Sequence, residues 1–451
     1  MLGKIFQRFV DNSPISVMAR GFLERAFNSN KVDELFERVA KRQYTRDLLF
    51  SVVFDLMSRV VCGSYRSVHA AYQASDQEIA VSVTSVYNKL NGVETKTSAS
   101  LVRYSAQATE PIIERMGGTL PPLLPGYRVK ILDGNCLDAT EHRIHELRGT
   151  AAGALPGKSL VVFDPALKLV VDVFPWEDGH VQERTLLHQV LPTVEAGDCW
   201  IADRIFCTRR FLFTVAERDA YFIVRQHKNL PWERKGRMVR VGPVDGGMVD
   251  EQLVVVQDGQ GHELRLRRIR IGLDEPTRDG EREVFLLTHL PQKVTARKVA
   301  NLYRQRWTIE TAFQELAEHL NSEINTLGYP KAALFGFSIA LIAYNVMSVV
   351  KAALRSVHGA ETIEREVSGY YVADEISATY RGMMIAIPEK QWHIFSRMTI
   401  QELARVLRML ASKVNLRKYQ KHPRGPKKPP PPRRCDKNRY HVSTFKLIAQ
   451  R

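Results

Sequence analysis

One stretch of the sequence restricts the possible folds more than any other. Residues 332–350 run for nineteen positions without a charged side chain, between Lys331 and Lys351. Such a stretch has to leave water, either in a membrane, which it is long enough to span, or in the core of a large domain. The stretch also contains three polar side chains, which are Ser338, Asn345 and Ser348. We therefore expect a buried core helix, and a membrane protein is an alternative that rests on this stretch alone.

The charge balance indicates the class of partner. The chain has 65 Lys and Arg residues against 49 Asp and Glu residues, a net charge of +16. Such an excess is typical of proteins that bind a polyanion, so nucleic acid or an anionic membrane surface is expected. The five cysteines form no C-x-x-C pair, which argues against a disulfide framework and a zinc knuckle. The first ten residues lack the apolar core of a signal peptide, and we expect a cytoplasmic protein.

The 451 residues suffice for several structural regions. Helical periodicity fills residues 15–90, and prolines at 121–125 mark a break. The elements expected after the break are strands at 129–132, 160–163 and 169–174, a helix at 182–194, a strand at 199–202, a helix at 208–218 and a strand at 221–224. Three strands, helix, strand, helix, strand is the order of a ribonuclease-H-like α/β fold.

We divide the chain accordingly. Residues 1–120 are expected to form an N-terminal helical DNA-binding region. The ribonuclease-H-like catalytic domain takes 121–226 and 283–355, and the Gly-rich, alternating residues 227–282 between its two parts predict a β-strand insertion. Residues 356–451 are expected to form a C-terminal helical region with a basic, proline-rich tail.

Two segments could contact DNA directly. Short helices around 67–74 and 82–90 resemble a helix-turn-helix, and an ordinary surface helix pair is the alternative. The residues expected to face a DNA groove are Ser85, Asn88 and Lys89. Residues 413–439 hold eleven basic side chains against one acid and a run of four prolines, which is consistent with phosphate contact or with a solvated linker.

Acidic residues follow two of the predicted strands. Asp133 comes directly after the run 129–132, with Gly134 beside it, and Asp203 comes directly after 199–202. Carboxylates at the ends of adjacent strands would point into one cleft. Each aspartate alone could equally be a turn former or a helix cap.

A third acidic residue lies on the helix expected at 296–320. At about 100° per residue, Tyr303, Arg306 and Glu310 share a stripe beside the apolar face of that helix. An exposed ion pair between Arg306 and Glu310 is the alternative, but it leaves the tyrosine unexplained.

Three carboxylates in one cleft raise one another's pKa, so they are stable there only with cations. Ligands that are all oxygen suit Mg²⁺ or Mn²⁺, and two such ions can activate water and stabilise a leaving oxygen of a phosphodiester. The residues alone therefore predict a metal-dependent nuclease or phosphoryl transferase acting on double-stranded DNA.

These residues also carry a resemblance to a known family. The helix matches a Y-x2-R-x3-E signature, and the Asp-Gly-Asn and Ala-Asp-Arg-x-Phe segments match two aspartate motifs. Over about residues 125–445 the chain resembles the DDE transposases of the insertion sequence 4 family, in the branch with the YREK signature. The resemblance implies a bacterial, nucleoid-associated homodimer with no membrane partner. Such an enzyme binds terminal inverted repeats, cleaves the DNA ends, often through a hairpin, and joins the 3′-OH to target DNA.

The resemblance assigns roles by position. It makes Asp133, Asp203 and Glu310 the ligands of two Mg²⁺ or Mn²⁺ ions. It also implies residues that contact DNA near the cleaved end, which are Tyr303, Arg306 and Arg204.

One position departs from the signature. Ala317 stands where the signature has a lysine, so either Lys331 replaces that base or the copy is weakened. A catalytically weakened relative or a transposition repressor is therefore the alternative function. Relatives hold a tryptophan in the β insertion that fills the gap left by a flipped base, and Trp232 is the tryptophan of residues 227–282.

Overall fold

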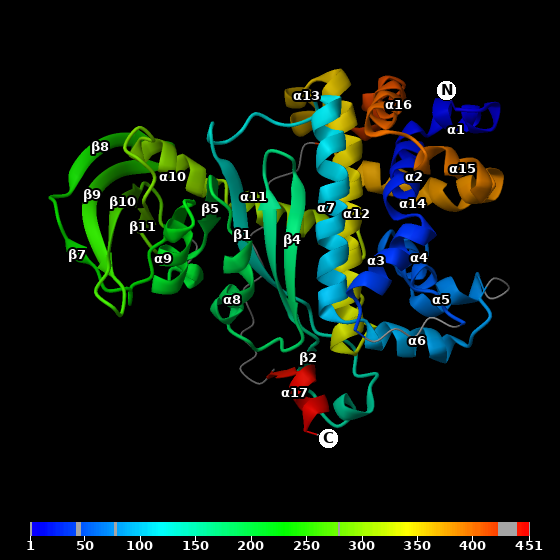
Figure 1. Cartoon of the computed structure of the whole chain (residues 1–451), viewed down its shortest axis with the longest axis horizontal. Coiled ribbons are helices and arrows are strands. Elements are labelled where there is room, and N and C mark those ends of the chain that lie inside the picture. Colours follow the sequence, from blue (N-terminus) through cyan, green and yellow to red (C-terminus); the bar gives the residue numbers. More distant parts are fainter. Residues whose placement is uncertain (1, 42–46, 76–78, 278–279, 423–439, 451) are drawn as a thin grey trace.

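A computed structural model of the chain describes residues 2–41, 47–75, 79–277, 280–422 and 440–450. A long mixed β-sheet forms one side of the molecule and a body of helices forms the other (Figure 1). Two long helices, α7 (Thr95–Met116) and α12 (Pro330–His358), run side by side between them. The protein is thus a mixed α/β structure in which sheet and helical body share one central pair of helices.

The predicted core helix is α12. In the part of the chain that the structure describes, it is the one helix long and apolar enough to cross a membrane, and 94% of its most apolar stretch is buried inside the protein. The elements that cover it include α7, α4 (Phe50–Val61), α16 (Ile400–Ser412) and the edge strand β4 (Leu169–Trp176). This burial agrees with the expectation of a core helix.

The three polar residues singled out in α12, which are Ser338, Asn345 and Ser348, each make hydrogen bonds. Asn345 is fully buried, and its amide accepts from Val170 N at 2.9 Å and donates to Val170 O at 2.9 Å and to Ser105 Oγ at 2.8 Å. Ser338 donates to a carbonyl of its own helix, and Ser348 donates to Lys168 O at 2.6 Å. Asn345 therefore ties α12 to β4 and α7 at once.

Replacing Asn345 with leucine should destabilise the protein. The side chain keeps a similar size, but the N–H and C=O groups of Val170 lose their partner in a buried place, which costs about 2–5 kcal/mol of unfolding free energy. Urea unfolding measures this loss. Ser338→Ala on the same helix is the control and should cost less than about 1 kcal/mol, because Ser338 bonds only its own helix. Equal losses in the two variants would contradict the tie.

The strands expected at 129–132, 160–163, 169–174, 199–202 and 221–224 all form and belong to one sheet. Its strands along the path are β4, β3 (Lys158–Asp164), β1 (Arg128–Cys136), β5 (Asp198–Ala202), β6 (Tyr221–Arg225), β11 (Glu283–Thr288), β10 (Glu263–Leu273), β9 (Gly247–Gln257) and β7 (Glu233–Arg234), with β8 (Val239–Val244) also paired to β9. β5 runs parallel to both β1 and β6, and the other neighbours are antiparallel. Strands β7 to β10, which lie within 227–282, thus extend the main sheet through β11.

The helix expected at 182–194 is mostly replaced by shorter turns. The segment consists of the 3₁₀ helix η3 (Glu183–Leu186), one turn of α-helix α8 (Leu187–Val190) and the 3₁₀ helix η4 (Leu191–Thr193). Pro192, which has no N–H for a helical bond, lies in the last of them. Between β5 and β6 the helix α9 (Arg209–Glu217) forms where expected, with the Thr208 side chain capping its first turn.

Helices from the two ends of the chain form one body. The N-terminal elements are η1 (Lys4–Phe6), α1 (Gln7–Asn12), α2 (Pro14–Phe27), α3 (Ser29–Val39), α5 (Val68–Gln73) and α6 (Val83–Gly92). The C-terminal helices α14 (Gly369–Ala386), α15 (Glu389–Ser396) and α16 pack against α2, and α13 (Ala360–Glu366) follows α12 (Figure 1).

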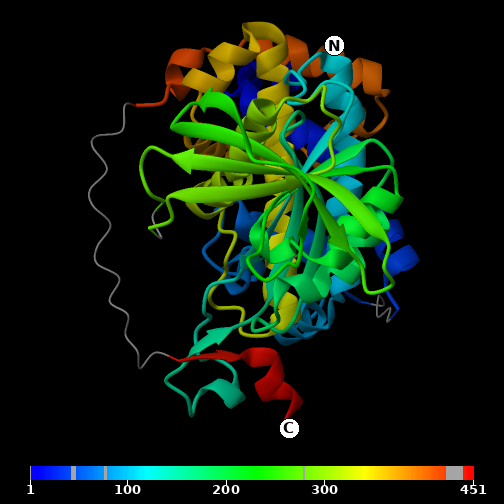
Figure 2. The ribbon, with the colours of Figure 1, turned by 90° about the vertical axis from the view of Figure 1, so that its left-hand side faces the viewer.

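The basic tail is anchored at both ends. Residues 413–422 are folded, with the 3₁₀ helix η6 (Leu416–Tyr419) and an ion pair of 2.8 Å between Lys413 and Asp11, whereas 423–439 lie outside the described residues. Beyond them β12 (His441–Ser443) pairs in parallel with β2 (Gly153–Leu155), and α17 (Thr444–Ala449) contacts η2 (His145–Leu147) (Figure 2).

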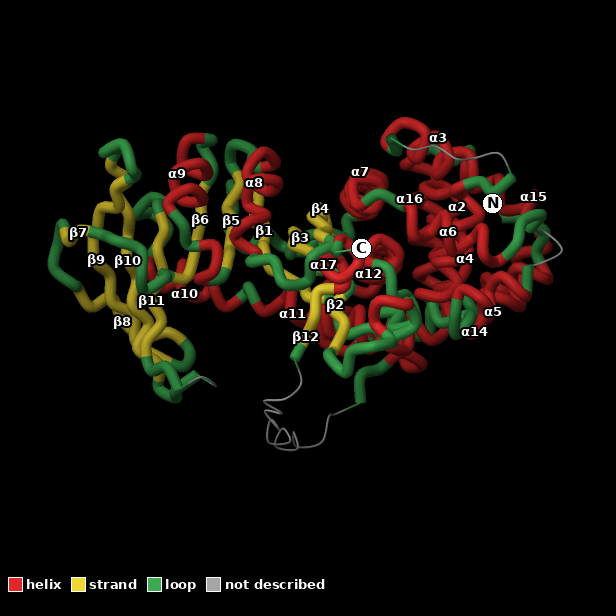
Figure 3. Tube along the Cα trace, turned by 90° about the horizontal axis from the view of Figure 1, so that it is seen from below, coloured by secondary structure: helices red, strands yellow, loops and turns green. Residues whose placement is uncertain are grey.

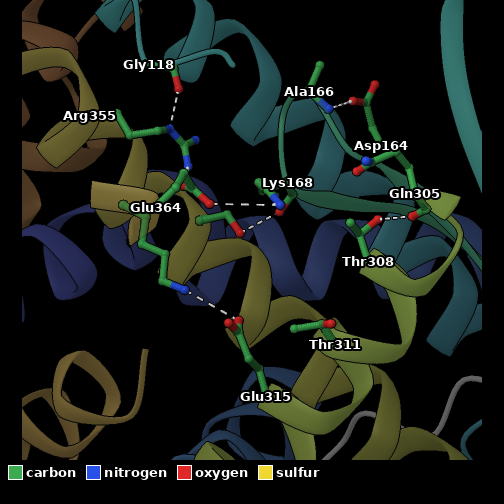
Figure 4. A network of polar contacts seen from close by, with 12 residues as sticks. Gly118, Asp164, Ala166, Lys168, Gln305, Thr308, Thr311, Glu315, Arg355 and Glu364 are labelled. Atoms are coloured by element: carbon green, nitrogen blue, oxygen red, sulfur yellow. Dashed lines mark hydrogen bonds and ion pairs between the residues drawn. The ribbon is translucent and has the colours of Figure 1, made fainter. Parts of the chain in front are cut away.

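The helix expected at 296–320 is broken. α10 (Ala296–Arg304) ends before Gln305, and α11 (Trp307–His319) begins after Arg306. The Thr308 hydroxyl donates to Gln305 O at 2.6 Å and so satisfies a carbonyl at the break, while Glu315 of α11 meets Lys351 of α12 at 3.4 Å (Figure 4). This corner, which we call the α10–α11 corner, is thus anchored on the buried helix.

Candidate active site

The two aspartates lie at the same edge of the sheet. β1 and β5 are parallel neighbours, and their last paired residues are Leu132 and Ala202. Asp133 directly follows Leu132, and Asp203 directly follows Ala202. β1 itself continues to Cys136 along β3, so Asp133 lies within a strand, whereas Asp203 lies just beyond one.

The α10–α11 corner brings three further side chains to this edge. Tyr303 Oη donates to Asp203 Oδ1 at 3.2 Å. Arg306 Nη1 lies 2.8 Å from Asp133 Oδ2, and Arg306 Nη2 lies 2.7 Å from Glu310 Oε1. Direct contacts therefore join Asp203 to Tyr303, and Asp133 and Glu310 to Arg306, although the helix that carries three of these residues is broken.

The electrostatics of this group follow from its burial. Burial raises the pKa of Asp133 to about 6, with Glu310 and Glu183 adding to the rise and Arg306 opposing it. Burial together with the neighbouring Asp203 raises the pKa of the Tyr303 hydroxyl above its ordinary value. The site therefore concentrates negative charge in a place where water screens it poorly, which favours a bound cation.

Glu183 is a fourth carboxylate at the site that the sequence did not single out. It is the first residue of η3, and a Cβ atom on Gly134 would fall 2.3 Å from its carboxyl carbon. Lys158 Nζ lies 3.8 Å from Glu183 Oε1. Burial raises the pKa of Glu183, and Asp203 adds to the rise. Gly134 thus leaves room for a carboxylate close to both aspartates.

Two other residues complete the surroundings. Trp307, the residue after Arg306, is 57% exposed, which is unusual for a tryptophan. Ala317 is exposed on α11, two turns past Glu310.

A pocket of about 690 Å³ adjoins the acidic group. Its lining residues are Arg204, Arg225, Gln226, His227, Lys228, Trp232, Arg268, Glu281, Glu283 and Phe285. The Arg268 guanidinium lies over the rings of Trp232 at 4.5 Å and of Phe285 at 3.8 Å. Arg204 directly follows Asp203 and pairs with Glu281 at 3.2 Å, and Arg225 pairs with the same carboxylate. Arg204 and Trp232 thus share one pocket.

The other expected DNA contacts lie elsewhere. Ser85 and Asn88 are exposed on α6, on the opposite side of α7 and α12 from β1 (Figures 1 and 3). Lys89 is turned toward the protein, where its ammonium donates to Leu48 O and lies 5.5 Å from the Phe36 ring centre. Lys331 is half-buried at the start of α12. Burial raises the pKa of Glu177, and the charge of Lys331 opposes part of that rise.

The donor chemistry of the site fits a divalent cation, because Asp133, Asp203, Glu310 and Glu183 supply only oxygen ligands. Within the described residues, however, no three Asp, Glu, His or Cys side chains are placed so that they could hold one ion. Arg306 stands between Asp133 and Glu310, and Tyr303 engages Asp203. The site thus contains carboxylates that suit a divalent cation, but in this structure these carboxylates contact an arginine and a tyrosine.

The sheet and its acidic cluster define an α/β protein with a candidate phosphoryl-transfer site. Residues 125–346 match the family described as a transposase DDE domain, and this match includes Asp133, Asp203 and Glu310. A curated protein of Sinorhizobium fredii (strain NBRC 101917 / NGR234), named "Putative transposase y4zB", is 26% identical over 222 residues, which are 47% of this chain and 59% of that protein. Both matches are therefore similarities to transposases over about half of this chain. The chain thus spans less than two thirds of the length of that relative.

A solved structure was also similar. It is the piggyBac transposase synaptic complex with hairpin DNA, which matches with 11% identity and a TM-score of 0.39 over 86% of each chain. A similarity at this level carries no argument for function.

Substituting Gly134 with alanine should cost about 1 kcal/mol of unfolding free energy, because the new methyl group overlaps the Glu183 carboxylate. The same substitution made in a Glu183→Ala background should cost almost nothing. A double-mutant cycle by urea unfolding measures the coupling, expected at about 1 kcal/mol. Additive losses would show that Glu183 does not occupy the space in front of Gly134.

Proposed function

We propose that the chain is a Mg²⁺- or Mn²⁺-dependent transposase of the insertion sequence 4 family, in its YREK branch. It binds the terminal inverted repeats of its element, cleaves the DNA ends and joins the 3′-OH to target DNA. The observation that carries the proposal is the convergence of Asp133, Asp203 and Glu310 at one sheet edge within the segment that matches the transposase DDE domain.

The topology supports a ribonuclease-H-like catalytic domain. Strands β4, β3 and β1 form an antiparallel set, and β5 and β6 continue it in parallel. This order places the ends of β1 and β5 side by side, which is the position that two acidic residues need to act on one phosphate. The net charge of +16 supplies attraction for DNA.

In this proposal Asp133, Asp203 and Glu310 hold two cations. When bound, such ions activate the attacking oxygen and stabilise the leaving oxygen of a phosphodiester. The chain's own residues orient the DNA: Arg306 offers a planar pair of N–H donors that suits a phosphate, and Tyr303 keeps its proton because of its raised pKa and can donate to an oxygen.

The pocket beside the site suits a nucleotide. Trp232 and Phe285 provide flat faces, and Arg204 and Lys228 provide positive charge for the phosphate. We assign this pocket to a base near the cleaved end. Ser85 and Asn88 on α6 and the basic residues of 413–439 are proposed as further DNA contacts, and the active form is proposed to be a homodimer in the bacterial cytoplasm.

A catalytically weakened relative or transposition repressor is the second candidate. Ala317 favours it, since this exposed position carries no charge for DNA. The test is to incubate the purified protein with DNA that flanks its own gene, with and without Mg²⁺. End-specific cuts that need Mg²⁺ support the transposase, and binding without cuts supports the repressor.

Removing one acidic ligand should abolish cleavage. We expect end cleavage to fall at least about 10³-fold in each of the variants Asp133→Asn, Asp203→Asn and Glu310→Gln, because each loses a metal ligand. DNA binding should persist, because none of the three changes removes a contact to phosphate. Cleavage assays and gel shifts measure the two properties. Asp245→Asn is the control, since the Asp245 side chain is 88% exposed and its ion-pair partner among the described residues is Arg304, at 2.9 Å. Normal cleavage by one of the three variants would remove that residue from the site.

Trp232→Ala should weaken binding of a cleaved DNA end about tenfold, because stacking on an aromatic side chain contributes about 1–3 kcal/mol per base. Trp232→Phe keeps a flat face and should retain most of the affinity. Fluorescence anisotropy with a labelled DNA end measures both. If alanine and phenylalanine weaken binding equally, the pocket does not stack a base.

A further inference from the structure

The protein itself already engages every carboxylate of the proposed metal site and compensates part of its negative charge. Without DNA, each carboxylate has a partner on the α10–α11 corner: Tyr303 donates to Asp203, and the Arg306 guanidinium bridges Asp133 and Glu310. The two guanidinium nitrogens of this bridge contact one oxygen of each carboxylate, at 2.8 and 2.7 Å. Arg306 therefore engages carboxylate oxygens that a cation shared by Asp133 and Glu310 would need as ligands.

The arginine is held there largely by these two ion pairs. Its side chain is only 13% exposed, and its Nε atom is buried with no hydrogen-bond partner among the residues that the structure describes. A buried donor left unpaired is costly. The bridge thus compensates the two carboxylates without satisfying the whole guanidinium, which leaves Arg306 able to gain from a better partner.

A divalent cation and the guanidinium compete for the same carboxylates. Both are positive and would bind the same carboxylate oxygens at close range, so a cation at Asp133 and Glu310 requires Arg306 to withdraw. A DNA phosphate is the partner that can draw it away, because arginine binds phosphate oxygens through two parallel N–H groups.

We propose that Arg306 acts as an internal counter-cation that keeps the metal site closed until a DNA phosphate binds it. This inference rests on the proposed function and adds its regulation. Withdrawal of Arg306 toward phosphate frees Asp133 and Glu310, so DNA ends and metal ions bind cooperatively. Because such coupling is reciprocal, metal also strengthens the binding of the DNA end. The cleavage site is therefore assembled only where DNA is in place.

The test is Mn²⁺ binding to the full chain without DNA, followed by electron paramagnetic resonance at pH 8, where carboxylates are ionised. Arg306→Gln should bind Mn²⁺ at least about fivefold more tightly than the wild type, the lower end of common coupling strengths. Arg304→Gln is the matched control: it removes the same charge from the same corner, where Arg304 pairs with exposed Asp245, and should bind like the wild type. Circular dichroism checks folding.

Arg306→Lys is the second variant, which serves if the glutamine variant does not fold. Lysine keeps the charge but has one compact ammonium in place of the fork that reaches both carboxylates, so Mn²⁺ binding should again be tighter than in the wild type. Equal or weaker Mn²⁺ binding in the folded Arg306 variants would overturn the proposal, because it would mean that Arg306 organises the ligands instead of competing with the metal.

A DNA arm completes the test. A duplex carrying the flanking end of the gene should tighten Mn²⁺ binding to the wild type at least about fivefold and change the Arg306→Gln value little. No effect on the wild type would also overturn the coupling. Asp133→Asn separates the two ideas: if all variants bind Mn²⁺ no better than Asp133→Asn, with or without DNA, the proposed function fails as well. Binding that depends on Asp133 but not on Arg306 overturns only the counter-cation role.

Discussion

The structure depends on the need to bury α12 on every side. A helix without charged residues over nineteen positions has no face that can be left to water, so other elements must surround it. The sheet edge at β4 covers one side, α7 another, and helices from both chain ends the rest. Asn345 then fixes the registration of these layers, because its amide can satisfy the backbone of Val170 at one position only.

That packing carries through to the candidate site. α11 is anchored to α12 by the contact between Glu315 and Lys351, and the break before Trp307 lets Arg306 turn toward β1. The group of acidic residues at this sheet edge then needs positive charge nearby. The protein provides it from the α10–α11 corner, and so the same arginine that suits a phosphate is also the present partner of two proposed metal ligands. Positioning, charge balance and regulation meet in one side chain.

Much of this site was predictable because it depends on local rules. Asp133 and Asp203 directly follow the two predicted strands at 129–132 and 199–202, and these strands pair in parallel up to Leu132 and Ala202. Tyr303, Arg306 and Glu310 converge on them despite the helix break, since the corner keeps all three on the side that faces the sheet. The break itself was not predictable, because the apolar spacing of 302–320 continues across it.

The sequence by itself determined that α12 must be buried, where the strands β1, β3, β4, β5 and β6 form, and that Asp133 and Asp203 lie next to the paired ends of two of them. These properties follow from composition and period, which act within a few residues. Only the tertiary structure decided that β7 to β10 extend the main sheet, that Lys89 turns inward, and that Glu183 reaches the space in front of Gly134. Each of these depends on which distant segment fills a given space or pairs with a given strand edge, and such contacts leave no periodic trace in the chain.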